Sequence, residues 1–228
     1  MADPITNKVQ VTGYAGAQAG VVNTPSSQVS QFNPGQVRFF NPTDTYMNAG
    51  AVLGGEISYK GSFARAEVGA GTALSGKIEL GHSFDIGRNM GLELSGKAQA
   101  NMNLIKSDYS ASVYAGDNNL ASGVGIKQKW RPGETRLAGA AKLTFGSTKA
   151  KFGVGIEAGS RKSLRPDMNY DLTAKAGATE STMQGSIKNK SQFYATPTVS
   201  ADVKISKNLS FNANADLHQA QAGIRWNF

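Results

Sequence analysis

Eight lysines in this chain lie on the polar face of segments in which polar and apolar residues alternate. Six of them form three pairs whose members are two positions apart. Because side chains of a β-strand alternate between its two faces, both members of such a pair point the same way. The set consists of Lys77, Lys97, Lys127, Lys129, Lys149, Lys151, Lys188 and Lys190. Rings of lysine side chains bias a pore towards anions. If this face lines a water-filled interior, the sequence predicts a basic-leaning lumen.

A second basic group lies in "SRKSLRPD", residues 160–167, which we interpret as a connection between strands. Its cations are Arg161, Lys162 and Arg165. One interpretation is a contact with phosphorylated lipid headgroups or another anion. The other is a solvated basic loop, and both stay open at this point.

Catalytic and metal-binding groups are sparse. The chain has no cysteine and two histidines, His82 and His218, which are too few to form a strong metal site unaided. The segment "GTALSGKI" ends on Ile78 where a phosphate-binding loop needs a hydroxyl. We expect no cofactor and no enzymatic activity. An outer-membrane hydrolase is the alternative, and its activity would be lost in His218→Ala.

The elements that carry these residues are strands. "GKIELGHSFDI" puts Ile78, Leu80 and Phe84 on one face, with lysine and acidic residues on the other. The apolar residues switch between even-numbered and odd-numbered positions, a change of parity, at turn-like segments such as "GRN", "GDNN", "RPGET" and "GST". This pattern predicts an all-β fold, an antiparallel up-and-down transmembrane β-barrel of about twelve strands, within a range of ten to fourteen.

We expect one domain, residues 1–228. Residues 21–47 break the alternation and contain three prolines. We interpret them as a long first loop or a lumen plug, with a short strand at 37–40.

The orientation of the two faces decides the class of function. The charged strand residues that we compared all fall on the polar face. About a dozen strands enclose a lumen that small apolar side chains cannot fill, so the polar face should point inwards to water. A lysine facing lipid at mid-depth costs about 2–4 kcal/mol, which explains its absence from the apolar face. The alternative is a soluble secreted barrel or sandwich that binds a lipid-like ligand.

The chain ends on "QAGIRWNF", in which Ile224, Trp226 and Phe228 alternate with polar residues or glycine. This octet resembles the closing strand of bacterial outer-membrane β-barrel proteins, a class that commonly ends on Phe. Gln221 and Gly223 also resemble a mitochondrial barrel signal, but a motif flush with the terminus favours the bacterial version. The resemblance identifies a class and no specific family. It implies a place in the bacterial outer membrane and recognition by the barrel-assembly machinery.

Function follows from this class as an expectation. We expect a small porin-like channel, or a structural or adhesion component, with membrane lipid, including lipopolysaccharide, as partner. The net charge is +8, but the basic residues are distributed along the polar faces of many strands and form no patch with aromatic residues. This distribution disfavours nucleic-acid binding. "MADPITNK" has no signal-peptide pattern, so either export uses another route or Met1 precedes a mature chain, and we favour the second.

Overall fold

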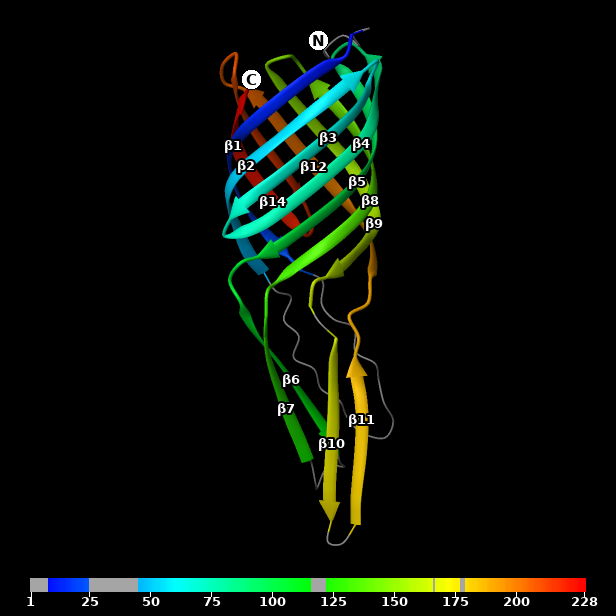
Figure 1. The fold of residues 1–228 in the computed structure, drawn as a ribbon. Coiled ribbons are helices and arrows are strands. Elements are labelled where there is room, and N and C mark those ends of the chain that lie inside the picture. The colour runs from blue at the N-terminus through cyan, green and yellow to red at the C-terminus, as the bar shows by residue number, and fades with distance from the viewer. Residues whose placement is uncertain (1–7, 25–44, 116–121, 166, 177–178) are drawn as a thin grey trace.

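The computed structural model describes residues 8–24, 45–115, 122–165, 167–176 and 179–228, with backbone alone for 107–130 and 168–187. Ten strands form a closed antiparallel barrel, in the ring order β1-β14-β13-β12-β9-β8-β5-β4-β3-β2 (Figure 1). Their bounds are β1 (Gln10–Asn23), β2 (Thr45–Tyr59), β3 (Ser62–Gly71), β4 (Ala73–Gly87), β5 (Met90–Asn103), β8 (Gly133–Gly146), β9 (Ala150–Ser163), β12 (Gln192–Lys204), β13 (Leu209–Asp216) and β14 (Gln219–Asn227). The predicted all-β barrel is confirmed, and ten strands fall within the expected range.

Two hairpins stand outside this ring. β6 (Ser107–Ala115) pairs with β7 (Ser122–Trp130), and β10 (Met168–Ala176) pairs with β11 (Thr179–Ile187), each pair as a separate two-stranded sheet. Both hairpins extend from the same end of the barrel (Figure 1). They interrupt the meander between β5 and β8 and between β9 and β12. Alternation alone therefore counted strands that do not belong to the wall.

The two ends of the barrel differ in their connections. At the end that carries both termini, strands are joined by 60–61, 88–89, 147–149 and 205–208. The first of these turns is tight, with positive φ at Lys60 (48°) and Gly61 (84°). The other end carries two short connections, 72 and 217–218, and three long ones, 24–44, 104–132 and 164–191. Outer-membrane barrels have short periplasmic turns and longer extracellular loops. We therefore assign the end with the termini as the periplasmic end and the other as the extracellular end.

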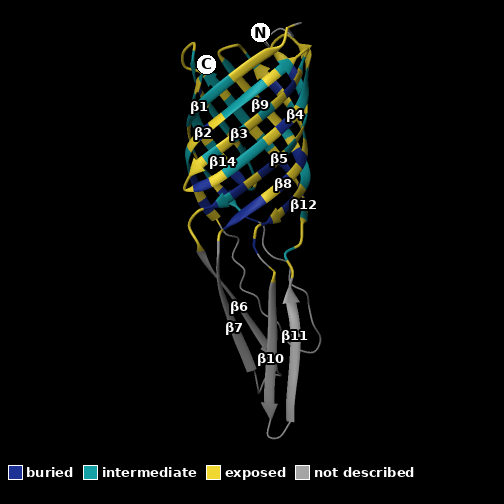
Figure 2. Cartoon of the chain, viewed as in Figure 1, coloured by how far each residue is buried: buried dark blue, intermediate teal, exposed yellow. Residues whose placement is uncertain are grey.

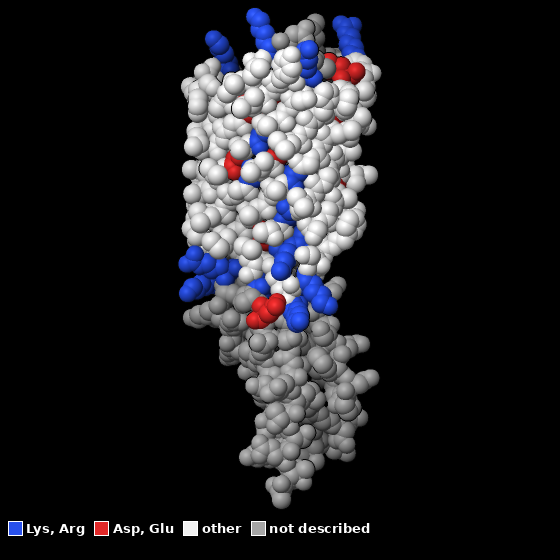
Figure 3. All heavy atoms as spheres, turned by 45° about the vertical axis from the view of Figure 1, so that its right-hand side comes forward, with Lys and Arg blue, Asp and Glu red and all other residues white. Residues whose placement is uncertain are grey.

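The outer face of the barrel is apolar and the inner face is charged. On β4, Ile78 and Leu80 are each 58% exposed, whereas Glu79 between them is 8% exposed. Burial alternates in this way along the barrel strands (Figure 2). Lysine and arginine gather at the two ends, and most of the surface between them is uncharged, apart from a column of basic and acidic atoms that runs down the middle of the face shown in Figure 3. This arrangement is the predicted orientation, and it contradicts the soluble alternative, which needs the apolar face inside.

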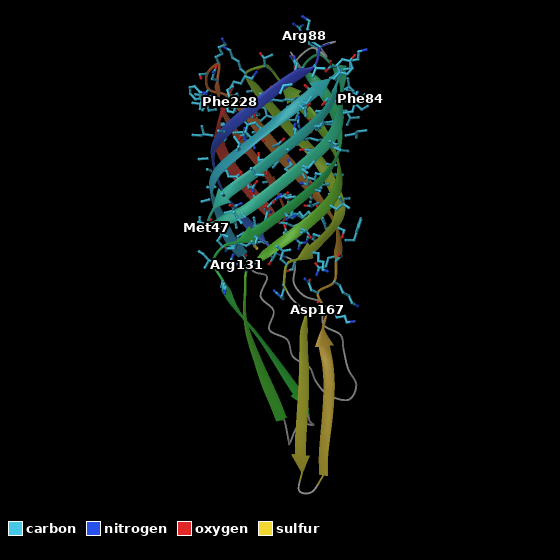
Figure 4. The ribbon with its side chains drawn as sticks, in the orientation of Figure 1. Met47, Phe84, Arg88, Arg131, Asp167 and Phe228 are labelled. Atoms are coloured by element: carbon cyan, nitrogen blue, oxygen red, sulfur yellow. The ribbon has the colours of Figure 1, made fainter. Side chains whose placement is uncertain are left out.

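Aromatic side chains concentrate on the outer face at the periplasmic end, where Figure 4 labels Phe84 and Phe228. The exposed members of this belt are Tyr59, Phe84, Phe145, Phe152, Phe211, Trp226 and Phe228. Phe145 and Phe152 stack with ring centroids 6.0 Å apart. Aromatic girdles of this kind mark the interface between membrane and water. Among the other aromatic residues, Phe193 is exposed towards the extracellular end, and the side chains of Tyr109, Trp130 and Tyr170 lie outside the described residues.

The predicted loop or plug at 21–47 is tested only at its ends. Residues 21–23 belong to β1 and residues 45–47 to β2, while 25–44, including the strand expected at 37–40, lie outside the described residues. Among the residues that the structure describes, no helix is long and apolar enough to cross a membrane.

Leu80→Lys provides a test of this orientation. Leu80 is exposed near the middle of β4, so a lysine there should lower the free energy of unfolding by about 2–4 kcal/mol. Ile86→Lys, near the end of the same strand, should cost only about 0–1 kcal/mol because the lysine reaches the interface. Urea unfolding in lipid vesicles measures both. Equal losses at the two positions would contradict a membrane centred on Leu80.

Candidate functional site

Charged side chains from many strands of the wall converge in the lumen. A cavity in the lumen has a volume of about 380 Å³. Six basic residues line it: Arg65, Lys77, Lys97, Lys142, Lys151 and Arg225. Seven acidic residues line it as well: Glu56, Glu67, Glu79, Glu93, Glu157, Asp202 and Asp216. The lining is close to charge balance, so the predicted basic excess is not found in this cavity.

Arg65 organises the periplasmic half of the lumen. Its guanidinium pairs with Glu56 at 2.5 Å on β2, and it lies 3.6 Å from Glu93 on β5 and 3.9 Å from Glu79 on β4. Lys142 on β8 pairs with the same Glu93 at 2.7 Å. One chain of ion pairs therefore connects five strands of the wall, β2, β3, β4, β5 and β8.

A second cluster bridges the seam where the first and last strands meet. The Glu67 carboxylate on β3 accepts a hydrogen bond from the Tyr14 hydroxyl (2.7 Å) on β1 and pairs with Arg225 (2.6 Å) on β14. The Arg225 guanidinium lies 4.4 Å from the centre of the Tyr14 ring. A Cβ at Gly54 would come within 2.4 Å of the Tyr14 hydroxyl oxygen. The absence of a side chain at Gly54 makes room for this cluster.

Polar contacts also cross the middle of the lumen. Lys97 on β5 forms an ion pair with Glu157 on β9, and the Tyr194 hydroxyl on β12 donates to the same carboxylate. The Gln99 amide donates to Gln219 at 3.2 Å. This last bond joins β5 to β14, which lie on opposite sides of the ring. The lumen is therefore bridged from wall to wall at this level.

The extracellular half is closed by four charges, which we call the lumenal seal: Glu134, Arg136, Arg161 and Asp216. Arg136 pairs with Glu134 and, at 3.0 Å, with Asp216. Arg161 lies 3.8 Å from Glu134. The side chains of Glu134 and Arg136 are both 0% exposed. These side chains are therefore shielded from bulk water at this level of the lumen.

Apolar and polar side chains pack around the seal. Val22 is 0%, Tyr46 is 6% and Asn101 is 1% exposed. Within the described part of the chain, several buried polar atoms here lack a hydrogen-bond partner, among them Glu134 Oε2, Arg136 Nη2, the Tyr46 hydroxyl and both side-chain polar atoms of Asn101. Buried polar atoms of this kind are commonly satisfied by ordered water.

The eight predicted lumen lysines separate into three groups. Lys77, Lys97 and Lys151 line the cavity. Lys149 lies exposed in the β8–β9 turn, and Lys188 and Lys190 lie exposed between β11 and β12. Lys127 and Lys129 belong to β7, which is outside the ring, and their side chains are not described. The prediction of a lumenal position is wrong for the lysines outside the wall. Alternation shows which face of a strand a residue occupies, but it does not show which strands enclose the lumen.

The predicted headgroup contact at 160–167 is also corrected. Strand β9 continues through Ser163, so Arg161 is a strand residue and not a loop residue. Arg161 and Arg165 are buried (8% and 4% exposed), and Arg161 takes part in the seal. Only Lys162 of this group is exposed, because alternation turns it to the outer face.

The seal itself was missed because "RPGET" has the composition of a turn. Glu134 and Arg136 fall in the first four residues of β8, and their parity matches that of Lys142 further along the strand. That shared parity was the available signal. The histidines lie apart: the His82 Nδ1 atom is 2.9 Å from the Ser62 hydroxyl at the periplasmic end, and His218 meets the Tyr194 ring edge-on in the β13–β14 turn. The described residues hold no cluster of histidines and carboxylates suited to a metal ion.

The terminal strand closes the barrel as its pattern predicts. The Phe228 amide donates to the Gly13 carbonyl at 3.0 Å, and Gly13 donates back at 3.3 Å. Ile224, Trp226 and Phe228 are 50%, 54% and 72% exposed on the outer face. Recognition of these three residues by the barrel-assembly machinery stays a prediction.

A closed ring of paired strands, an apolar exterior and a charged interior define a transmembrane β-barrel of the class found in the bacterial outer membrane.

No family model and no curated protein matches the chain. Solved structures similar to it include the outer membrane protease OmpT from Escherichia coli, at 9% identity and a TM-score of 0.40, covering 96% of each chain. The P. putida toluene transporter TodX is similar at 10% identity and a TM-score of 0.33, covering 94% of this chain and 67% of that one. Ail, the attachment invasion locus protein of Yersinia pestis, is similar at 9% identity and a TM-score of 0.29, covering 95% and 99%.

Deleting Phe228 tests the assembly signal. We expect a severalfold loss of folded barrel in the outer membrane, because the closing strand loses its last backbone bonds to Gly13 and its outward aromatic ring. The heat-resistant folded band on gels of outer-membrane fractions measures this loss. Phe84→Ala removes an exposed aromatic from the same belt and should leave assembly near normal. Equal losses in both variants would assign the effect to the belt and contradict a terminal signal.

Proposed function

We propose that this protein is a non-conducting outer-membrane scaffold that holds its two hairpins outside the cell for recognition or adhesion. The observation that carries the proposal is the lumenal seal. Its four charges and their neighbours close the extracellular half of the barrel, while the cavity lies on the periplasmic side of Glu134 and Arg136.

The placement of the connections supports the same function. Hairpins β6–β7 and β10–β11 leave the wall at the extracellular end, whereas the periplasmic turns are short. Loops carried by a rigid barrel are well suited to binding a partner. The ion pairs between five strands of the wall make the scaffold rigid.

A channel is the second candidate, favoured by the polar cavity of about 380 Å³. Because its lining is nearly balanced in charge, such a channel would have little preference for anions.

Conductance of the full-length protein in planar bilayers decides between the two. We expect no unitary steps from the wild type. Regular steps would overturn the scaffold and favour the channel. Hydrolysis of lipid or peptide that is lost in His218→Ala would instead support an outer-membrane enzyme.

Display of the hairpins is tested with two epitope insertions. An epitope inserted between residues 177 and 178, after β10, should bind antibody on intact cells. The same epitope between Arg88 and Asn89 should bind only after the outer membrane is opened, because that turn is assigned to the periplasmic end. Labelling of the 88–89 epitope on intact cells would contradict the assigned orientation.

A further inference from the structure

The outer face of the barrel is hollowed across β12, β13, β14 and β1. This hollow has a volume of about 510 Å³, and we call it the alanine groove. Its outward-facing residues are Ala19, Val21, Val199, Ala201, Ala213, Ala215, Ala220 and Ala222. A convex barrel in lipid normally presents larger side chains, so this surface has room for an apolar group that enters it.

The strand register explains the hollow. Ala201 on β12 pairs with Ala213 on β13, and Ala213 pairs with Ala222 on β14. Ala222 in turn pairs with Ala19 on β1, so four alanines lie side by side across four strands. In the next row towards the extracellular end, Val21 and Val199 stand at the two sides. The alanines form the floor of the groove, and the larger side chains of Val21 and Val199 form its edges.

Three exposed lysines lie at the extracellular rim, beside β12 and its neighbour β9. Lys162 ends the outward row of β9, and Lys188 and Lys190 precede β12. Asn189, between the last two, is fixed in place: its side chain donates to the Ser163 carbonyl (2.5 Å) and the Arg165 carbonyl (2.7 Å). Basic residues gather at this rim in Figure 3, which brings the right-hand side of Figure 1 forward.

The charge at this rim is positive overall. Asp167 is the neighbouring acid, labelled at the extracellular end in Figure 4, and its carboxylate accepts a hydrogen bond from the backbone N–H of Asn189 at 2.7 Å. Within the described residues, no ion pair occupies Lys162, Lys188 or Lys190. Lys162, Lys188 and Lys190 bring three positive charges against the single negative charge of Asp167, so this rim can attract phosphate groups.

The spacing between rim and groove matches one leaflet of a membrane. Phe193, 79% exposed on β12, marks the edge of the apolar surface just above the lysines. Val199 is six residues further along β12, about 20 Å along the strand and roughly 15 Å in depth for a strand tilted by about 40°. Half of a hydrocarbon core of about 30 Å is the same depth.

We propose that a phosphate-bearing glycolipid of the outer leaflet binds along β12, with its phosphates on Lys162, Lys188 and Lys190 and the end of one acyl chain in the alanine groove. The chain crosses Phe193 and Pro197 to reach Val199. A second copy of this barrel fits the groove poorly, because a two-fold interface would set one hollow against another. The proposal depends on the assigned orientation and is independent of whether the lumen conducts.

Native mass spectrometry of the full-length protein in detergent tests the site, with added bisphosphorylated lipid A as the probe. We expect the wild type to bind lipid A and to bind dephosphorylated lipid A or inorganic phosphate much more weakly. Lys162→Gln, Lys188→Gln and Lys190→Gln together should weaken lipid A binding by about tenfold to a hundredfold. The matched control replaces three exposed lysines of the periplasmic end by glutamine: Lys60, Lys149 and Lys207.

The groove is tested by filling it. Ala213→Leu with Ala220→Leu should weaken lipid A binding severalfold, whereas Ala64→Leu with Ala98→Leu, on the outer face of other strands, should not. Unchanged binding in the lysine variant or in the groove variant would overturn the proposal. Equally tight binding of inorganic phosphate would reduce the site to an anion site. Loss of a protein dimer in the groove variant, with lipid A binding intact, would assign the groove to a second copy. Conductance of the wild type would contradict the proposed scaffold function, but it would not contradict the proposed lipid site.

Discussion

Arg136→Met is expected to lower the free energy of unfolding by about 3–5 kcal/mol, the usual result of removing one member of a buried ion cluster. The substitution leaves Glu134 and Asp216 buried in the seal with only Arg161 to compensate them. Methionine keeps most of the side-chain volume, so the loss reports charge and hydrogen bonds. Urea unfolding in lipid vesicles measures it.

Glu56→Gln is the matched control for this prediction. It breaks the ion pair with Arg65, whose two side chains are each about one-third exposed, so it should cost only about 0–1 kcal/mol. Arg65 also keeps its contacts with Glu79 and Glu93. A loss below about 1 kcal/mol for Arg136→Met would contradict a tightly paired seal.

Removing all four charges of the seal is expected to turn a silent barrel into a conducting one. The variant carries alanine at Glu134, Arg136, Arg161 and Asp216, so two positive and two negative charges disappear together and the net charge is unchanged. Planar-bilayer recordings should then show unitary steps where the wild type has none, because a wet path joins the periplasmic cavity to the extracellular end.

The control for this variant empties the opposite half of the lumen. Alanine at Glu56, Arg65, Glu93 and Lys142 also removes two charges of each sign, but it leaves the seal in place, so no steps are expected. Migration of the folded band on gels verifies that both variants form barrels. A folded seal variant that stays silent would place the barrier elsewhere and contradict the role given to the seal.

Parity predicted the two faces of the wall because the cost of a charge in lipid acts on every strand in the same way. It could not predict ring membership, since β7 alternates like β8 and only pairing partners separate them. The turn-like "RPGET" concealed Glu134 and Arg136 for a different reason. A proline and a glycine precede them, yet the strand begins directly at Gly133.

The ion pairs themselves were beyond sequence spacing. Arg225 and Glu67 are 158 residues apart, and they meet because the ring brings β14 within reach of β3 across β1 and β2. Alternation places both side chains in the lumen. The partner that each one finds depends on strand tilt and on the curvature of the wall, which depend on the whole ring.

The seam between the first and last strands has a consequence for the order of the chain. Tyr14 pairs with Asn227, so the start of β1 and the end of β14 lie side by side at the same rim. A short linker could join them while a new start is cut between Arg88 and Asn89. Such a circular permutant keeps every neighbour in the wall and should refold in detergent. In cells, Phe228 of this permutant would no longer be the terminal residue. The permutant therefore tests separately whether the barrel can close and whether the chain is delivered to the membrane.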